Sequence, residues 1–165
     1  MNMPVANSEM IAEHHRGEFT VSTDPSRLDL DAIHNFLANC YWAKGEPREV
    51  VARSIEHALC FGVYDGSSAQ VGFARVISDF ATIAYVGDVF VLESHRGCGL
   101  GKWLMECITQ HRSLQGLRRW ILTTRDAHGL YEQVGFTPVK FPERYMERHD
   151  PLVYETSTHE IGKTT

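Results

Sequence analysis

One segment constrains the fold of this chain more than any other, because an extended apolar stretch runs directly into three glycines and then into a helical pattern. The segment is residues 88–102, DVFVLESHRGCGLGK, with glycine at positions 97, 99 and 101. Glycine has no Cβ, so successive backbone N–H groups there can turn toward one point. The helix that follows adds the positive end of its dipole. The segment therefore predicts a strand, a loop and a helix that together bind an anion such as phosphate.

The spacing within this segment excludes two well-known phosphate loops. A Walker A loop that ended at residues 101–102 would need Gly in place of Arg96 and Ser or Thr in place of Trp103. A dinucleotide fingerprint that began at Gly97 would need Gly in place of Lys102. Neither a nucleoside triphosphatase nor a dinucleotide-binding protein is therefore indicated.

A pattern that does fit is Arg96-x-x-Gly99-x-Gly101, the Arg/Gln-x-x-Gly-x-Gly/Ala signature characteristic of the GCN5-related N-acetyltransferases (GNAT family). A second block, residues 122–136 with the sequence LTTRDAHGLYEQVGF, resembles the later motif of that family: a strand, a helix carrying Leu-Tyr, and then Gly-Phe. One departure is Thr124, which stands where the family often has Asn. The two blocks occur in the family's order, and the chain resembles that family over roughly residues 85–137.

The resemblance implies that an acceptor amine attacks the thioester carbonyl of acetyl-coenzyme A and that a thiolate leaves. Tyr131 matches the acid position of the family, and a tyrosine keeps its proton at neutral pH because its ordinary pKa is about 10. Asp88, at a position where related enzymes often carry an acidic residue, is the first candidate for the base. The residues expected to hold the cofactor are Phe90, Val91, Leu92, Arg96, Gly97, Cys98, Gly99, Leu100, Gly101, Lys102, Thr124 and Asp126.

The acceptor pocket is expected near the junction of the first two helices. The stretch of residues 41–47, YWAKGEP, which carries Tyr41 and Trp42, lies there and is a candidate to line the pocket, although an aromatic plug on the core is an equal alternative. Arg75 and Asp79 flank a predicted strand and are candidates to face the same cleft, and His128 is the one histidine singled out beside the second motif. The nine histidines show no HxxxH or HxH spacing, so no metal site is expected.

The catalytic assignments have structural alternatives. Tyr131 falls on the apolar stripe of its own helix, with Leu130 and Val134, so an ordinary core tyrosine fits the same pattern. Asp88 could instead end strand pairing or bond to neighbouring backbone. Cys98 lies beside the positive end of a helix, which favours a thiolate, but the motif places no base beside it and no nucleophilic role is expected.

Composition predicts a single cytosolic domain. The 165 residues, 43% of them hydrophobic, suffice for one core. A net charge of −5 with scattered Lys and Arg argues against a nucleic-acid surface, and no apolar run approaches the ~20 residues of a membrane-spanning helix. The four cysteines form no CxxC pair, and no secretory signal is recognised at the N-terminus. No nucleic-acid or membrane partner is therefore expected, and a homodimer stays open.

Hydrophobic periodicity and turn residues predict the order of elements. Residues 1–16 are expected to be a flexible extension, residues 17–150 an acetyltransferase domain, and residues 151–165 a tail. The expected fold is a GNAT-like α/β (α+β) domain with a mixed, mostly antiparallel sheet flanked by helices. Its helices are expected to begin near Asp29, after Pro47, at Leu100 and after an N-cap at Asp126, and its strands to span residues 18–23, 60–64, 70–78, 81–92, 120–123, 136–140 and 144–148.

The sequence therefore predicts an acetyl-coenzyme A-dependent N-acetyltransferase that acts on a primary amine of a small molecule or a peptide, with no metal. A catalytically idle acyl-coenzyme A-binding module that regulates a partner is the alternative from another class. A protein or peptide acetyltransferase is a third. The presence of both the glycine loop and Tyr131 favours an enzyme, and no motif identifies the acceptor.

Overall fold

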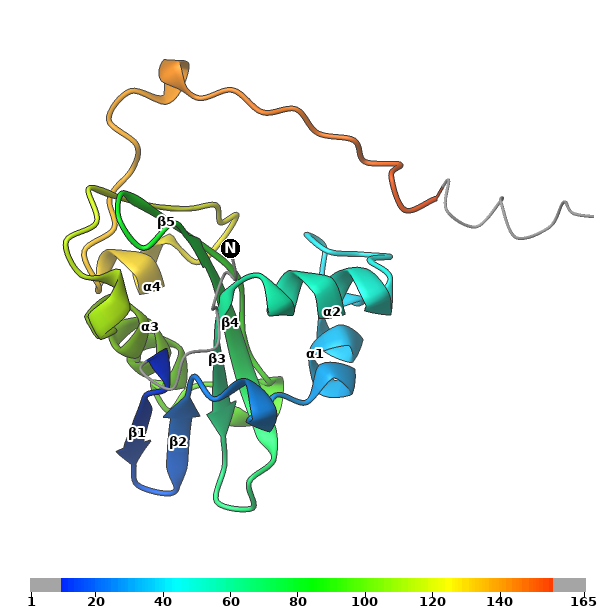
Figure 1. The fold of residues 1–165 in the computed structure, drawn as a ribbon, viewed down its shortest axis with the longest axis vertical. Helices are drawn as coiled ribbons and strands as arrows, with labels where there is room; N and C mark the ends of the chain where they lie inside the picture. The colour runs from blue at the N-terminus through cyan, green and yellow to red at the C-terminus, as the bar shows by residue number, and fades with distance from the viewer. Residues whose placement is uncertain (1–9, 156–165) are drawn as a thin grey trace, which may run out of the picture.

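The computed structural model describes residues 10–155, and within them the chain forms a single sheet of six strands with four α-helices (Figure 1). The strands are β1 Glu13–Arg16, β2 Phe19–Ser22, β3 Leu59–Tyr64, β4 Gln70–Ser78, β5 Ile83–Val91 and β6 Arg119–Leu122, and they lie in the sheet in sequence order. Strands β1 to β5 are antiparallel neighbours, whereas β6 runs parallel to β5. The helices are α1 Leu30–Leu37, α2 Arg48–Glu56, α3 Leu100–Gln110 and α4 His128–Glu132.

Helices cover both faces of this sheet, which explains why β3 is buried along its whole length. Helices α1 and α2 pack on one face, where Ile33 and Leu37 join Phe73 and Phe90 in one buried cluster. Helices α3 and α4 pack on the opposite face, in a larger cluster that includes Phe61 and a set of α3 side chains, Leu100, Leu104, Met105, Cys107 and Ile108. The expected mixed α/β fold class is confirmed.

The local signals for the first three helices are also confirmed. The Asp29 side chain caps α1 by accepting a hydrogen bond from Ala32 N at 3.0 Å. Pro47 directly precedes α2, and Gly99 stands at the N-cap of α3 with φ of 79°. A left-handed residue before a helix is where glycine costs least, since it has no Cβ.

Three local expectations are wrong. Strand β1 lies inside the segment expected to be a flexible extension, and its polar sequence, EHHR, shows no apolar pattern because it is an edge strand. The strands expected at residues 136–140 and 144–148 do not form; Pro138 and Pro142 each lack the N–H that a ladder needs, and only a short 3₁₀ turn, Pro142–Arg144, occurs there. Asp126 does not cap α4, whose N-cap is Ala127; the Thr124 hydroxyl accepts the hydrogen bond from Ala127 N instead.

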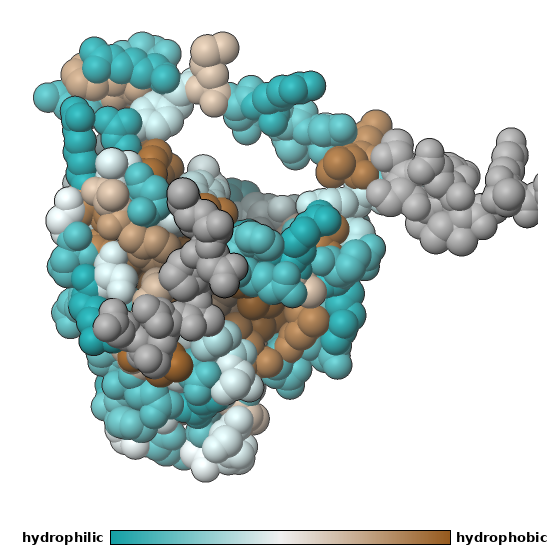
Figure 2. Space-filling model, viewed as in Figure 1, coloured by the Kyte–Doolittle hydropathy of each residue, from teal (hydrophilic) through white to brown (hydrophobic). Residues whose placement is uncertain are grey.

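The chain after α4 forms an arm, defined here as residues 137–155. It stands apart from the folded body over most of its course (Figures 1 and 2). Near its end the arm returns to the body, because the Tyr154 hydroxyl comes within 3.5 Å of Glu46 Oε1. In the described part of the chain, no helix has the length and apolar character needed to cross a membrane.

Candidate active site

A cleft of about 1090 Å³ opens where β5 and β6 part. The two strands pair from Ile83 to Val86 of β5, but β5 continues to Val91 while the chain after Leu122 turns into a loop and α4. One wall is therefore the second half of β5, and the other is residues 123–127 with α4. The glycine loop forms one end of the cleft, and the loop between α1 and α2 contributes the other.

A β-bulge deforms β5 at the cleft. The register with β4 passes from the pair Arg75–Gly87 to the pair Phe73–Phe90, so Asp88 and Val89 both lie opposite Ala74. Asp88 has φ of 54°, a left-handed conformation that Asp tolerates better than most residues. A bulge leaves one residue outside the hydrogen-bond ladder, and backbone groups of this wall are thus available to a ligand.

The glycine loop has the geometry of an anion site. Gly97 and Gly99 both have positive φ, 81° and 79°, and no hydrogen bond among the described residues uses the N–H of Gly97, Cys98 or Gly99. Helix α3 starts directly after them, so its unpaired N–H groups and its dipole act at the same place. Two arginines fix the loop: Arg96 Nε donates to Val91 O at 3.0 Å, and Arg16 Nη2 donates to Cys98 O at 2.9 Å.

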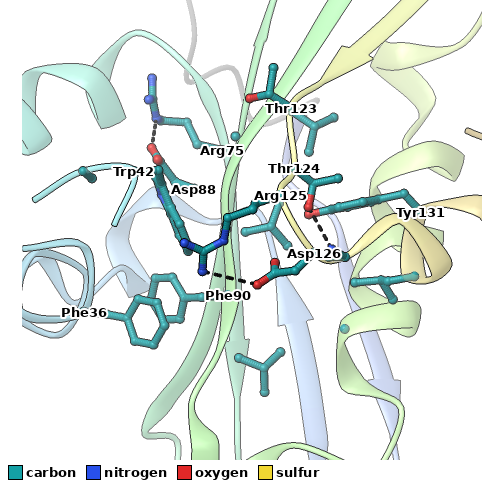
Figure 3. A pocket seen from close by; sticks show the side chains of 18 of the residues that line it. Phe36, Trp42, Arg75, Asp88, Phe90, Thr123, Thr124, Arg125, Asp126 and Tyr131 are labelled. Carbon is teal, nitrogen blue, oxygen red and sulfur yellow. Dashed lines mark hydrogen bonds and ion pairs between the residues drawn. The ribbon is translucent and has the colours of Figure 1, made fainter. Parts of the chain in front are cut away.

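Tyr131 projects from α4 into the wall opposite β5 (Figure 3). The residue is 9% exposed, and no hydrogen bond joins its hydroxyl to another of the residues that the structure describes. Burial raises the pKa of Tyr131, and the neighbouring Tyr41, Asp126 and Tyr85 raise it further. The phenol therefore stays protonated throughout the neutral range and is free to donate into the cleft.

The other end of the cleft carries acidic and aromatic side chains. Asp88 Oδ2 accepts a hydrogen bond from Arg75 Nε at 2.7 Å, and both side chains of this ion pair are less than 20% exposed. Glu46 lies half-buried in the same lining. Burial raises the pKa of Glu46, and the negative charge of Asp88 raises it further. The aromatic residues that line this cleft are Phe36, Tyr41, Trp42, Tyr85, Phe90 and Tyr154.

A contact between two loops closes part of this end. The Arg125 guanidinium lies over the Tyr41 ring, 3.8 Å from its centroid, and Tyr41 in turn makes an edge contact with Trp42. Figure 3 shows Arg125 reaching across the cleft toward Trp42 from the loop that precedes α4. Tyr41 and Trp42 are about half exposed, so they line the cleft and do not form a plug in the core.

The structure brings most of the predicted site residues into this one cleft. Its lining contains Tyr41, Trp42, Arg75, Asp88, Phe90, Val91, Arg96, Gly97, Gly99, Leu100, Gly101, Lys102, Thr124, Asp126 and Tyr131. Leu92 and Cys98 belong to the same segments without lining it.

Two predicted acceptor residues lie elsewhere, which corrects their placement. Asp79 lies in the turn between β4 and β5, where its carboxylate accepts hydrogen bonds from the N–H groups of Ala81, Thr82 and Ile83. The Thr82 hydroxyl donates to the same carboxylate at 2.6 Å, and this bond first, with the backbone bonds after it, lowers the pKa of Asp79. His128 lines a separate cavity of about 250 Å³ on the far side of Tyr131.

Sequence reasoning missed several side chains that the fold brings to the cleft. Glu46 lies within residues 41–47, the stretch expected to line the acceptor pocket, but its contact with Tyr154, 108 positions away, follows from no local pattern. Tyr85 lies on β5 before the bulge, and Arg16 lies in the segment expected to be an extension. Among the described residues, no group of three or more His, Cys, Asp or Glu side chains could hold a metal ion.

Much of the chain that forms this cleft matches a known protein family. Residues 56–138 match the family described as acetyltransferase (GNAT) domain. A protein of Xanthomonas campestris pv. campestris, assigned to that family and solved as a crystal structure, is 52% identical with a TM-score of 0.80; the match covers 85% of this chain and 99% of that one. A Gibberella zeae protein assigned as an acetyltransferase is 33% identical, covering 70% of this chain and 77% of the relative. Chloroplastic serotonin N-acetyltransferase 2 of Oryza sativa subsp. japonica is 30% identical, covering 72% and 61%.

Proposed function

Because the chain belongs to the GNAT acetyltransferase family, we propose that it moves an acetyl group from acetyl-coenzyme A to a primary amine on a small molecule. One observation carries the proposal. A single cleft joins an anion-binding loop, a buried tyrosine that keeps its proton and an acidic end lined with aromatic rings. These are the three environments that a phosphorylated acyl donor, a thiolate leaving group and an ammonium acceptor require.

The residues present fit the acyl donor. The free N–H groups of Gly97 and Gly99, with the start of α3, would hold its pyrophosphate. The bulged half of β5 would offer backbone groups to the pantetheine chain and to the oxygen that becomes negative during attack. Arg96 lies beside both, since its Nε is held by Val91 O while the rest of its guanidinium stays available. When bound, acetyl-coenzyme A supplies the thioester.

Tyr131 would protonate the departing thiolate. Tyr131 lines the cleft, and no hydrogen bond joins its hydroxyl to another described residue, so the hydroxyl is available to a ligand. Its raised pKa keeps the phenol protonated until the carbon–sulfur bond breaks and a thiolate forms beside it.

The acceptor would enter at the acidic end. At this end Arg75 is paired with Asp88, and Arg125 has Asp126 beside it at 3.5 Å, so the carboxylate of Glu46 is the group that would attract a protonated amine. The aromatic lining favours an amine carried on an apolar or aromatic body. The relative named for serotonin supports including arylalkylamines among the candidates. One of the two carboxylates would then remove the proton that makes the amine unreactive.

An acceptor screen tests this proposal. Release of free thiol from acetyl-coenzyme A is measured with arylalkylamines, aliphatic diamines, amino sugars and peptides with free N-termini or lysines. We expect the highest kcat/KM with a small amine. A preference for peptides would favour a protein acetyltransferase. Tight binding of acetyl-coenzyme A without thiol release by any amine would favour an idle acyl-coenzyme A-binding module.

The cellular location and the oligomeric state are separate questions. A cytosolic location and a homodimer stay predictions, and the rice relative is named as chloroplastic.

A further inference from the structure

We propose that Glu46, on the loop between α1 and α2, takes the proton from the acceptor ammonium, and that Asp88 serves as its charged neighbour, held in place by Arg75. The inference rests on the proposed amine acetylation and specifies which side chain removes the proton. It assigns a chemical role to a residue that neither motif of the family contains. It also replaces Asp88, which the sequence favoured for this step.

Four side chains that line the cleft could in principle accept a proton from the acceptor. The carboxylate and imidazole groups that line the cleft are Glu46, Asp88, His95 and Asp126. His95 lies at the phosphate end, where its Nδ1 bonds to Ser94 and its Nε2 faces Asp65 at 3.7 Å. Asp126 is on the Tyr131 wall, with a side chain 67% exposed beside Arg125. Only Glu46 and Asp88 therefore remain at the acceptor end.

Asp88 is already engaged. Its Oδ2 accepts the short hydrogen bond from Arg75 Nε, and the pair is almost enclosed. A carboxylate in such a charge-assisted bond gains less by accepting a further proton, because protonation would leave the buried guanidinium without its counter-charge. In Figure 3, Arg75 and Asp88 point at one another from β4 and β5. This geometry suits a fixed negative charge better than a group that must gain and lose a proton at every turnover.

Glu46 is held firmly while its carboxylate faces the cleft. The backbone N–H of Glu46 donates to Ala43 O at 3.0 Å, and its carbonyl oxygen accepts from His34 Nε2 at 3.1 Å. Pro47 then fixes the chain at the entry to α2. Among residues 10–155, the hydrogen bond to its carboxylate comes from the Tyr154 hydroxyl at 3.5 Å, a long contact that an incoming ammonium can displace.

The surrounding charges make this carboxylate a good proton acceptor. The titratable and charged groups that act on it are Asp88 from β5, Arg75 from β4, His34 from α1 and Tyr154 from the arm. Burial and Asp88 dominate, and both raise the pKa of Glu46. A base is most effective when its pKa approaches the working pH, and Glu46 is shifted in that direction.

Every proton that the acceptor nitrogen loses is accounted for when Tyr131 acts as the acid and Glu46 as the base. The ammonium gives one proton to a Glu46 oxygen, the freed lone pair attacks the carbonyl carbon, and the carbon–sulfur bond breaks. The thiolate takes the proton of Tyr131. The second proton lost by the nitrogen restores Tyr131, and Glu46 releases its own proton to water, so the net products are amide, free thiol and one proton.

Paired variants test the inference. With an amine that the wild type acetylates, we compare Glu46→Gln, Asp88→Asn and the control Glu49→Gln, whose carboxylate is exposed on α2 outside the cleft. We expect Glu46→Gln to lose about 10²–10⁴-fold in kcat/KM near neutral pH. The loss should shrink as pH rises toward the pKa of the amine itself, because free amine then no longer needs a base. Asp88→Asn should raise KM for the amine more than it lowers kcat, and Glu49→Gln should match the wild type.

A readout independent of turnover accompanies the kinetics. A carbon-13 titration of the Glu46 carboxyl in wild-type protein should show a pKa above that of an exposed glutamate, and Asp88→Asn should lower it. Stabilisation by acetyl-coenzyme A should be unchanged in Glu46→Gln, which shows that this variant is folded. If Glu46→Gln does not fold, Glu46→Asp takes its place, and a kcat that falls while acetyl-coenzyme A binding is kept supports the inference.

Failures of the two proposals are distinguishable. A wild type that releases no thiol with any amine contradicts the proposed acetylation and the inference together. An active wild type in which Glu46→Gln keeps the wild-type pH profile, while Asp88→Asn loses it, overturns the inference alone and returns the role to Asp88.

Discussion

Replacing Tyr131 by Phe separates a catalytic tyrosine from a structural one, because the change removes one oxygen and keeps the ring. Tyr131 is only 9% exposed, and it belongs to the buried cluster on the face of the sheet that α3 and α4 cover. No hydrogen bond joins the Tyr131 hydroxyl to another described residue, so the substitution removes none between these residues. We therefore expect the free energy of unfolding to change by less than the ~1 kcal/mol that a lost hydrogen bond typically costs.

The expected catalytic effect is much larger. Without Tyr131 the thiolate must leave unprotonated or take a proton from water, and kcat should fall by about 10²–10⁴-fold with KM for the amine nearly constant. Steady-state thiol release and urea unfolding of the same preparations measure both quantities. A variant that is less stable by about 1 kcal/mol yet turns over at the wild-type rate would remove Tyr131 from catalysis and make it a core residue.

Three further changes test other parts of the cleft. Gly99→Val should abolish stabilisation by acetyl-coenzyme A, which for the wild type is about 2.7 kcal/mol at a hundredfold excess over Kd; Gly116→Val, at a similar φ of 76° in a turn away from the cleft, is the control for strain, and equal loss of binding in both would contradict the loop assignment. Arg16→Gln should raise the Kd of acetyl-coenzyme A several-fold in titration calorimetry, since it releases the Cys98 carbonyl; an unchanged Kd would show that β1 does not support the loop. The pKa of Glu46 is raised in the folded state, so its contribution to stability is present below the unfolded value of 4.5 and is lost as pH rises through the folded pKa. Glu46→Gln should therefore remove this decline from the free energy of unfolding measured between pH 4 and 7. An unaltered dependence of that free energy on pH would refute the raised pKa.

Local chemistry explains which features the sequence could predict. The glycine loop, the Asp29 cap and the Pro47 boundary each depend on residues within a few positions of one another, and all three occur as expected. Strand β1 was missed because an exposed edge strand needs no apolar side chains, and its polar residues resemble an extension. Phe136 and Val139 predict a strand at residues 136–140, but Pro138 interrupts that segment and Pro142 opens a 3₁₀ turn before the strand expected at 144–148.

The candidate site also contains residues that local motifs predict and residues that they do not. Tyr131 and the phosphate loop follow from motifs, whereas the acidic end depends on contacts between distant segments. The charge of Asp88 acts on Glu46 because the loop between α1 and α2 and the bulged half of β5 line one cleft, and Tyr154 reaches Glu46 from the far end of the described chain. A pattern of residue spacing contains no information on such a meeting, since neither the bulge nor the course of the arm is encoded in a short stretch of sequence.

In the proposed mechanism, burial raises the pKa of two groups in the cleft that have opposite roles, one as acid and one as base. Burial raises the pKa of Tyr131 on one wall and of Glu46 at the acceptor end. For the tyrosine, the shift keeps a proton in place until a thiolate needs it. For the glutamate, the shift makes an otherwise weak base accept a proton from an ammonium. The contact between Arg125 and Tyr41 lies over the acceptor end of the same cleft and adds no negative charge there. The aromatic and arginine side chains at this end therefore support the chemistry of both groups although they exchange no proton themselves.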